Sequence, residues 1–303
     1  MSDSAAPTAP PMSIPAADRS TPEAPLRALD TLWLQVGGTL CNLACTHCFV
    51  SCSPSNHTHA MMSLEQVLPY LEQAAALGVK EFYLTGGEPF LNPQIEPIIA
   101  AALARGPVTV LTNGMLLDGA RCARLAELAR RSAYSLDLRV SLDGLDEERN
   151  DAVRGAGSFR RALEGIRRLA ACGLEPVLTV SEVDPESSSP ESRRSFLDLL
   201  GSCGVRRPRL KLLPLFQIGA ESERRSGYED WQRLSARDGE EGFDHLQCTS
   251  CRAVTDQGVW VCPILVNEPT ARMGETLGDA LRPFPLTHAA CWTCHVYGVS
   301  CRT

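Results

Sequence analysis

The sequence lacks the features that mark a membrane protein or a nucleic-acid-binding protein. No apolar run reaches the roughly eighteen residues of a membrane-spanning helix. Basic residues are not in excess, because 29 Lys and Arg face 36 Asp and Glu, for a formal net charge of −7. Such a chain has no basic field to hold nucleic acid or an anionic membrane, and its local arginine clusters are most simply solvated faces. We therefore expect neither nucleic acid nor a membrane among its partners.

An export signal is also missing. Residues 1–27 are rich in Ala, Pro, Ser and Thr and contain no apolar h-region, so they predict a disordered leader and not a signal peptide. A cytoplasmic location is therefore expected, where a disulfide framework for the 13 cysteines is not favoured. Four of these cysteines lie in residues 41–52 and six in residues 248–301. This clustering predicts two metal sites.

Short apolar runs alternate with helical stretches from about residue 32 to residue 215. Strands are predicted at Leu32–Val36, Glu81–Thr85, Val108–Thr112, Leu136–Ser141, Pro176–Ser181 and Arg209–Leu213. Helices are predicted between them at Leu64–Leu77, Pro93–Arg105, Gly119–Arg131, Ser158–Ala171 and Ser192–Ser202. Strands that alternate with helices are typical of an α/β fold with a parallel sheet and right-handed crossovers. We expect a partial (β/α)6 TIM-type barrel that is open on one side.

The rest of the chain differs in composition. Residues 216–244 are polar and predict a linker. Residues 245–303 are rich in Cys, Gly and Pro with short apolar pieces, which predicts a small Cys-rich C-terminal domain stabilised by metal more than by an apolar core. The predicted order is thus a leader at 1–27, a core domain at 28–215, the linker, and the C-terminal domain.

Polar residues gather where the first four predicted strands end. Cys41–Cys48 follow the first strand, Gly86–Pro89 the second, Asn113–Gly114 the third and Ser141–Gly144 the fourth. Ligands of parallel α/β folds bind at the carboxyl ends of the strands. We therefore expect the four segments to converge on one mouth.

The first cysteine cluster has the spacing C-x3-C-x2-C at Cys41, Cys45 and Cys48. Thiolates are soft ligands that suit iron–sulfur clusters or zinc. A structural zinc ion needs four ligands, and a fourth is available at Cys52, His47, His57 or His59. Zinc therefore stays open on counting alone. The three-residue spacer favours an iron–sulfur cluster, because zinc knuckles usually open with C-x2-C or C-x4-C.

The stretch Cys41-Asn-Leu-Ala-Cys45-Thr-His-Cys48-Phe49 closely resembles the motif of the radical SAM superfamily. The resemblance implies that the three cysteines bind three irons of a 4Fe–4S cluster, while S-adenosylmethionine (SAM) chelates the fourth. In this family an electron from the cluster breaks the sulfonium–C5′ bond, and the resulting 5′-deoxyadenosyl radical abstracts a substrate hydrogen. His47 stands where family members usually have an aromatic residue. We expect a structural role for Cys52 and loop polar contacts for His57 and His59.

Gly86-Gly87-Glu88-Pro89 resembles the GGEP element of the same family, whose backbone and carboxylate bind the amino group of SAM. Glycines let a backbone approach a ligand closely, and the Glu88 carboxylate can accept charge-assisted hydrogen bonds from an ammonium group. The segment follows a predicted strand, about forty residues after the cysteine loop, which is the context that such a motif requires.

The fourth strand end, Ser141-Leu142-Asp143-Gly144 with Arg154 downstream, resembles the stretch that binds the SAM carboxylate in the sulfatase-maturase-like branch. Ser141 would donate one hydrogen bond and Arg154 a bidentate pair. Asn150–Asp151 stand where that branch often has His-Asp. Asp143 is either a cofactor contact or a turn residue, and Asn113 is either a ribose or substrate contact or a helix cap. The predicted cofactor-binding residues are Gly86, Gly87, Glu88, Pro89, Asn113, Ser141, Asp143 and Arg154.

The second cluster contains six predicted metal ligands, Cys248, Cys251, Cys262, Cys291, Cys294 and Cys301. Its two C-x2-C pairs are compatible with a zinc ribbon. The segment from Gly258 to Cys262-Pro263 instead resembles the Gly…Cys-Pro hairpin of SPASM and twitch extensions, which bind auxiliary 4Fe–4S clusters. A full SPASM domain has seven or more cysteines. The six here predict one auxiliary cluster, and a second only with an open site or other ligands such as His288 or His295.

These resemblances imply a radical SAM enzyme with a peptide or small-molecule substrate and an electron donor such as a flavodoxin or ferredoxin. Peptide maturases usually carry an N-terminal peptide-recognition domain, which the leader does not resemble, so both substrate classes stay open. Substrate-facing residues are expected near Leu213–Gln217 and in the C-terminal domain, and no side chain there declares a catalytic role. The sequence does not decide whether an auxiliary cluster would conduct electrons or bind the substrate. The alternative, a non-catalytic zinc or iron–sulfur regulatory protein, explains the cysteines but not Gly86–Pro89 or Ser141 with Arg154.

Overall fold

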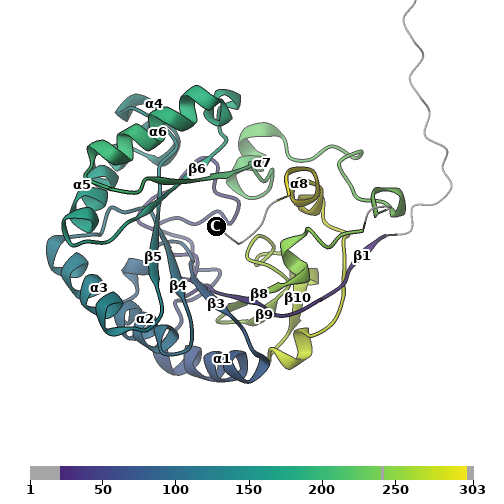
Figure 1. The fold of residues 1–303 in the computed structure, drawn as a ribbon. Helices are drawn as coiled ribbons and strands as arrows, with labels where there is room; N and C mark the ends of the chain where they lie inside the picture. The colour runs from purple at the N-terminus through teal and green to yellow at the C-terminus, as the bar shows by residue number, and fades with distance from the viewer. Residues whose placement is uncertain (1–20, 240–241, 299–303) are drawn as a thin grey trace, which may run out of the picture.

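The computed structural model describes residues 21–239 and 242–298. Its main element is a nine-stranded sheet in the order β10-β9-β8-β2-β3-β4-β5-β6-β7. The strands from β8 through β2 to β7 are parallel to their neighbours, and β9 and β10 are added antiparallel. The sheet curls into an open barrel with helices on its outside (Figure 1). The predicted α/β fold with a partial barrel is confirmed.

The six predicted strands of the core are all present. They are β2 (Thr31–Leu34), β3 (Glu81–Leu84), β4 (Val108–Thr112), β5 (Leu136–Ser141), β6 (Val177–Ser181) and β7 (Arg209–Leu213). All four residues of β2 are buried, as are most residues of β3, β4 and β6. This burial matches the near-continuous apolar sequence of parallel strands that are covered on both faces.

The predicted helices are present as α1 (Leu64–Leu77), α2 (Ile95–Leu103), α3 (Gly119–Arg131), α5 (Ser158–Ala171) and α6 (Pro190–Ser202). A capping box starts α1, because the Gln66 N–H donates to Ser63 Oγ at 3.2 Å and the Ser63 N–H donates to Gln66 Oε1 at 2.9 Å. The short helix α4 (Glu147–Arg154) has no apolar stripe, since only Asn150 and Arg154 are buried. Hydrophobic periodicity therefore could not reveal it.

The C-terminal segment extends the barrel sheet. Strand β8 (Cys251–Thr255) runs parallel to β2, with Cys251 opposite Thr31, and β9 (Gly258–Trp260) and β10 (Arg272–Gly274) continue from it. All five residues of β8 are buried. Without β8, strand β2 would be an exposed edge. The predicted boundary at residue 245 therefore separates segments that share one sheet.

The predicted linker at 216–244 contains the helix α7 (Ala220–Arg225), which packs on the cysteine loop. The Ala220 N–H donates to the Cys48 carbonyl oxygen at 3.0 Å. The side chain of Glu221 is fully buried, and its carboxylate lies 2.9 Å from Arg224 Nη2 and 3.4 Å from Arg225 Nε. The Glu/Arg-rich run is partly solvated as predicted, since Glu223, Arg224 and Arg225 are exposed, but it forms a helix in which Glu221 is buried and ion-paired.

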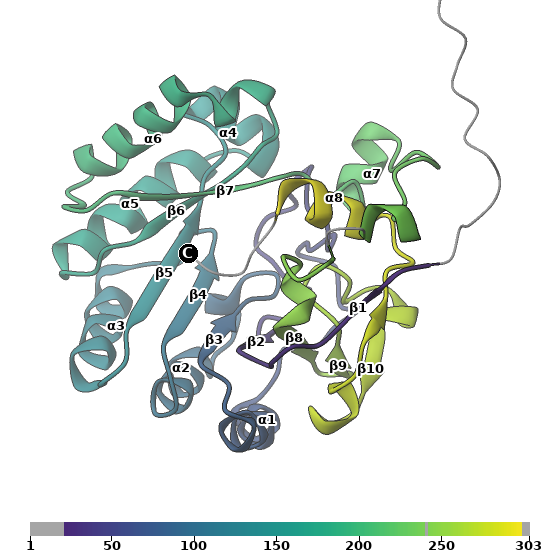
Figure 2. The ribbon, with the colours of Figure 1, turned by 45° about the vertical axis from the view of Figure 1, so that its right-hand side comes forward.

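Of the predicted leader, residues 1–20 lie outside the described residues. Strand β1 (Glu23–Ala24) pairs antiparallel with β11 (Phe284–Pro285), and Figure 2 shows β1 running beside the C-terminal segment. Residues 21–27 are therefore folded. The remaining elements are α8 (Ala290–Tyr297) and short 3-10 helices at Pro89–Leu91, Pro185–Ser188, Ala236–Gly239, Gln247–Thr249, Pro269–Ala271 and Gly278–Ala280. Among the described residues, no helix has the length and apolar character to cross a membrane.

Candidate active site and auxiliary cysteine site

A cavity of about 230 Å³ lies at the carboxyl ends of the barrel strands. Its wall includes residues from all four strand-end segments, together with residues of β2, β5, β6 and β7. Eight predicted site residues line it, namely Cys41, Cys45, Cys48, Gly86, Gly87, Asn113, Ser141 and Arg154. The structure therefore brings the strand ends together at one mouth, as the sequence pattern predicts.

The cysteine loop after β2 is folded by tight backbone turns. The Cys48 N–H donates to the Cys45 carbonyl oxygen at 3.2 Å, and the Ser51 N–H donates to the Cys48 carbonyl oxygen at 3.0 Å. Ser51 has a φ of 56°, in the left-handed region, so the chain reverses there. The thiols of Cys41, Cys45, Cys48 and Cys52 all lie on the cavity wall as a result.

These thiols suit a cluster better than a single ion. Within residues 21–239 and 242–298, no three Cys, His, Asp or Glu side chains form a group that could hold one metal ion. A zinc ion needs its ligand atoms about 2.0–2.3 Å from one point, whereas each thiolate of an iron–sulfur cluster binds a different iron. Three thiols on the wall of one cavity therefore fit a 4Fe–4S cluster, and this assignment of ligands stays a prediction.

Burial and one contact set the charge of these thiols. Burial raises the pKa of Cys41 to about 12 and that of Cys45 to about 11. A side-chain hydrogen bond from Cys52 lowers the pKa of Cys48, and the same contact, with burial, raises the pKa of Cys52. The Cys52 N–H also donates to Cys48 Sγ at 3.3 Å.

Gly86 and Gly87 pack directly against the start of the cysteine loop. The Gly87 N–H donates to the Gly38 carbonyl oxygen at 2.8 Å, and a Cβ on Gly87 would lie 2.1 Å from the Leu40 carbonyl oxygen. Gly86 has a φ of 138°, which side-chain-bearing residues rarely adopt. The two glycines therefore serve a close approach between two backbone segments, and both also line the cavity.

Glu88 is buried beneath the cavity and does not line it. Its Oε1 accepts hydrogen bonds from the Phe90 N–H at 3.0 Å and from Thr112 Oγ1 at 2.8 Å, and its Oε2 accepts one from the Asn113 N–H at 2.8 Å. Burial raises its pKa. Pro89 is also buried and away from the cavity wall. The Glu88 carboxylate therefore holds the end of β4, and the contacts of Glu88 and Pro89 with SAM stay a prediction.

Asn113 lines the cavity next to the first cysteine. Its Nδ2 donates to Asn42 Oδ1 at 2.7 Å and lies 3.8 Å from Cys41 Sγ. Its Oδ1 accepts a hydrogen bond from the Met115 N–H at 3.0 Å, which forms an Asx turn. The N-cap of α3 is Asp118, so Asn113 is not a helix cap. Its contact with ribose or substrate stays a prediction.

Asp143 is the centre of a buried ion-pair network beside the cavity. Its Oδ2 lies 2.7 Å from Arg154 Nε and 3.0 Å from His47 Nε2, and its Oδ1 accepts a hydrogen bond from the Ser181 N–H at 2.7 Å. Burial opposes ionisation, yet the Arg154 guanidinium holds the pKa of Asp143 well below its usual range. Asp143 itself does not line the cavity. Its carboxylate ion-pairs with Arg154 and His47, and its contact with the cofactor stays a prediction.

The wall inside the barrel contains residues that the sequence motifs did not reveal. Arg139 Nη2 donates to the Tyr83 hydroxyl at 3.1 Å, and the guanidinium lies 4.9 Å from the Tyr83 ring centroid. Trp33 stacks on the same ring with the centroids 4.4 Å apart. A signal for Arg139 was available in the strand Leu136–Ser141, where polar residues alternate with buried apolar ones and so face the barrel interior.

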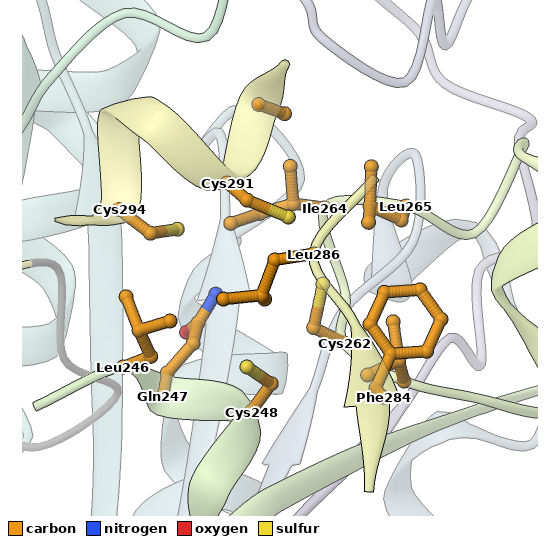
Figure 3. A pocket seen from close by; sticks show the side chains of 12 residues that line it. Leu246, Gln247, Cys248, Cys262, Ile264, Leu265, Phe284, Leu286, Cys291 and Cys294 are labelled. Atoms are coloured by element: carbon orange, nitrogen blue, oxygen red, sulfur yellow. The ribbon is translucent and has the colours of Figure 1, made fainter. Parts of the chain in front are cut away.

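Four cysteines of the C-terminal segment surround a second, smaller pocket. Cys248, Cys262, Cys291 and Cys294 line it together with mainly apolar side chains, and Figure 3 shows their sulfur atoms turned toward it. The cysteines come from the 3-10 helix Gln247–Thr249, the chain after β9, and α8. Burial raises the pKa of Cys291. Four thiols around one apolar pocket fit a single 4Fe–4S cluster, which takes four thiolates.

The other predicted ligands among the described residues do not line this pocket. Cys251 is buried in β8 and does not line it. His288 and His295 do not line it either, and His57 is exposed. Cys301 lies outside the described residues. Residues 21–239 and 242–298 therefore supply positions for one auxiliary cluster.

The cysteine loop is fastened to the C-terminal segment by polar contacts. His59 is 2% exposed, and its Nδ1 lies 3.1 Å from Asp256 Oδ1 while its Nε2 lies 2.8 Å from the Val266 carbonyl oxygen. Asn267 Nδ2 donates to the Val50 carbonyl oxygen at 2.9 Å. His59 is therefore a structural contact. These hydrogen bonds connect the loop that carries the first cysteine cluster to the segment that carries the second.

Residues 36–185 match the Radical SAM superfamily. The mycofactocin maturase MftC of Mycobacterium ulcerans is 35% identical over 135 residues, which cover 44% of this chain and 35% of the maturase. The GTP 3′,8-cyclase of Pectobacterium atrosepticum is 32% identical over 187 residues, which cover 61% of this chain and 54% of the cyclase. The chain thus spans about half the length, or less, of these curated relatives.

Two solved structures share the fold. SuiB of Streptococcus suis bound to the precursor peptide SuiA has a TM-score of 0.63 at 16% identity, covering 86% of this chain and 65% of SuiB. Native anSMEcpe with bound AdoMet has a TM-score of 0.60 at 15% identity, covering 86% of this chain and 81% of that one. The likeness extends beyond the barrel residues into the C-terminal segment. The chain therefore belongs to the radical SAM superfamily.

Proposed function

We propose that this chain cleaves SAM reductively and uses the resulting 5′-deoxyadenosyl radical to abstract a hydrogen from its substrate. The observation that carries the proposal is the single cavity of about 230 Å³, which Cys41, Cys45 and Cys48 line together with Ser141 and Arg154. When bound to these three cysteines, a 4Fe–4S cluster supplies the electron that splits SAM. The remaining side chains bind and orient the reactants.

Arg154 and Ser141 are proposed to bind the carboxylate of SAM. Asp143 Oδ2 lies 2.7 Å from Arg154 Nε, and the outer guanidinium nitrogens are the groups proposed to bind the ligand. A planar guanidinium binds a carboxylate through two parallel hydrogen bonds. The Ser141 hydroxyl on the same wall can donate a third hydrogen bond.

His47 has a ring nitrogen without a hydrogen-bond partner at the position just before the third cysteine. Its Nε2 lies 3.0 Å from Asp143 Oδ2 and 3.2 Å from Ser181 Oγ. Its Nδ1 is buried and has no hydrogen-bond partner among the described residues. We expect Nδ1 to form a hydrogen bond with a polar group of SAM or substrate.

The auxiliary site is proposed to carry electrons and not to bind substrate. Four thiols surround its pocket, so a cluster there has no open iron for a substrate atom. Gln247 and Ile264 line both this pocket and the barrel cavity, which places one layer of side chains between the two sites. An external flavodoxin or ferredoxin is the proposed electron donor.

A peptide is the substrate class that we favour. Among the relatives, MftC is a maturase and SuiB has been solved with a precursor peptide. The GTP 3′,8-cyclase keeps a small molecule as the second candidate. Deuterated peptides and deuterated small molecules, each incubated with the reduced enzyme, should transfer label to 5′-deoxyadenosine only when the correct class is present.

Anaerobic reconstitution tests the proposal. The chain should bind iron at both cysteine sites and, with dithionite, convert SAM to methionine and 5′-deoxyadenosine. The Cys41→Ala/Cys45→Ala/Cys48→Ala variant should lose about half of the iron and all SAM cleavage. If this variant still cleaves SAM, the proposal is wrong.

A matched control removes three cysteines that lie away from both sites. Cys122, Cys172 and Cys203 line neither cavity nor pocket. The Cys122→Ala/Cys172→Ala/Cys203→Ala variant should therefore keep its iron and its SAM cleavage. Iron binding without SAM cleavage in the unsubstituted chain favours the non-catalytic alternative.

A further inference from the structure

Arg252 is a fully buried arginine beside the auxiliary site. It follows Cys251 in β8, and it is 0% exposed. Its Nε donates to the Ala280 carbonyl oxygen at 2.9 Å, and its Nη2 donates to the Arg282 carbonyl oxygen at 2.9 Å. Its Nη1 donates to the carbonyl oxygens of Cys248 and Cys251, both at 2.7 Å. All four acceptors are uncharged.

Within residues 21–239 and 242–298, no carboxylate pairs with Arg252, and its hydrogen bonds all go to backbone carbonyls. A charge that is buried without a counter-charge is strongly destabilising. Burial lowers the pKa of Arg252, and the thiol groups of Cys251, Cys248 and Cys262 act in the opposite direction. The negative charge that matches this guanidinium is therefore the charge of the cysteine site next to it.

We propose that Arg252 is the positive counter-charge of the auxiliary cluster and raises its reduction potential. The inference rests on the proposed function, in which Cys248, Cys262, Cys291 and Cys294 hold that cluster. Reduction adds one electron from an external reductant and breaks no bond. The reduced site is more negative by one unit, so a buried positive charge stabilises it more than the oxidised site.

The same side chain also holds a cluster ligand in place. The two bonds from Nη1 connect β8 to the 3-10 helix Gln247–Thr249, which carries Cys248. A positioning role and a charge role predict different results. Arg252→Lys keeps the charge but loses the fork of donors, whereas Arg252→Gln keeps a donor but loses the charge.

A redox titration monitored by electron paramagnetic resonance separates the two roles. The full chain is used with Cys41→Ala/Cys45→Ala/Cys48→Ala, so that only the auxiliary site carries iron. Arg252→Gln and Arg252→Lys are compared with the control Arg282→Gln. Arg282 acts on Arg252 electrostatically, but it is exposed, so water screens its charge.

Arg252→Gln should lower the ratio of reduced to oxidised cluster at a fixed potential by about tenfold, or about 59 mV for one electron. Arg252→Lys and Arg282→Gln should stay within about threefold of the unsubstituted residue. If Arg252→Gln loses the auxiliary iron while Arg252→Lys binds it with a near-normal reduction potential, the charge role is also supported, because only the variant that keeps the charge then keeps the cluster.

Two results overturn the inference. One is an Arg252→Gln protein that binds iron and titrates within about threefold of the parent. The other is loss of auxiliary iron in both Arg252 variants, which assigns the residue to the positioning of Cys248 alone. If the parent itself binds no iron at this site, the proposed auxiliary cluster fails first, and that result is distinct from the other two.

Discussion

Replacing Asp143 with asparagine removes a buried charge on which two cavity residues depend. The carboxylate lies 2.7 Å from Arg154 Nε and 3.0 Å from His47 Nε2, and its side chain is 0% exposed. Asparagine keeps the shape and can still accept the Ser181 N–H, so the change isolates the charge. Removing one partner of a buried ion pair costs about 3–5 kcal/mol. We expect Asp143→Asn to lower the free energy of unfolding by about 3 kcal/mol or more.

The measurement is urea denaturation of the iron-free chain, which avoids any contribution from cluster binding. The matched control is Glu164→Gln, because Glu164 and Arg168 form an exposed pair on α5 at 3.1 Å with side chains 45% and 43% exposed. Its loss should cost less than about 0.5 kcal/mol. A loss below about 1 kcal/mol for Asp143→Asn would refute the argument, because the network would then not be a buried ion pair.

The pH dependence gives this prediction a sign. The folded-state pKa of Asp143 is lowered, so its carboxylate contributes stability that is fully present above the unfolded pKa of about 3.9. That contribution is lost as the pH falls toward the folded-state pKa. The difference in unfolding free energy between the chain and Asp143→Asn should therefore stay constant from about pH 5 to pH 8 and shrink below about pH 3.9.

Two further substitutions test the packing around the cysteine loop. Gly87→Ala would place a Cβ 2.1 Å from the Leu40 carbonyl oxygen, so iron at Cys41, Cys45 and Cys48 and SAM cleavage should each fall by about tenfold or more. Gly119→Ala, where nothing lies within 4 Å of the added Cβ, should change neither. His59→Ala breaks the contacts to Asp256 and Val266 and should lower the free energy of unfolding, measured by urea denaturation, by about 3 kcal/mol. The control His57→Ala changes an exposed residue and should leave the free energy of unfolding unchanged. Equal effects of the two substitutions would contradict the buried contact of His59.

The sequence was sufficient to predict the residues at the strand ends. Cys41, Gly86 and Ser141 each follow an apolar strand, and parallel strands must end at the same edge of a sheet. The direction in which the side chains of Glu88 and Asp143 point was not predictable in the same way. In a turn, a rotation of one residue decides whether a carboxylate points to a ligand or to the backbone, and no periodicity records it. Both carboxylates proved to be buried supports of their neighbours.

The pairing of the C-terminal segment with the barrel was also beyond the sequence. Strand β8 lies beside β2 although about 220 residues separate Cys251 from Thr31. Only the folded chain shows that the cysteine-rich segment completes the edge of the sheet. It also shows that a single arginine of that strand, Arg252, is fully buried beside Cys248, Cys251 and Cys262. A lone arginine between cysteines gives no such signal in the sequence.

The central claim is that the cysteine loop and the strand ends around it form a site for reductive cleavage of SAM. Anaerobic single-turnover experiments on the iron-loaded, dithionite-reduced chain test it most directly, by measuring methionine and 5′-deoxyadenosine together. The account predicts equal amounts of the two products, and no product from the Cys41→Ala/Cys45→Ala/Cys48→Ala variant. An iron-loaded, reduced chain that binds SAM and releases neither product would contradict it.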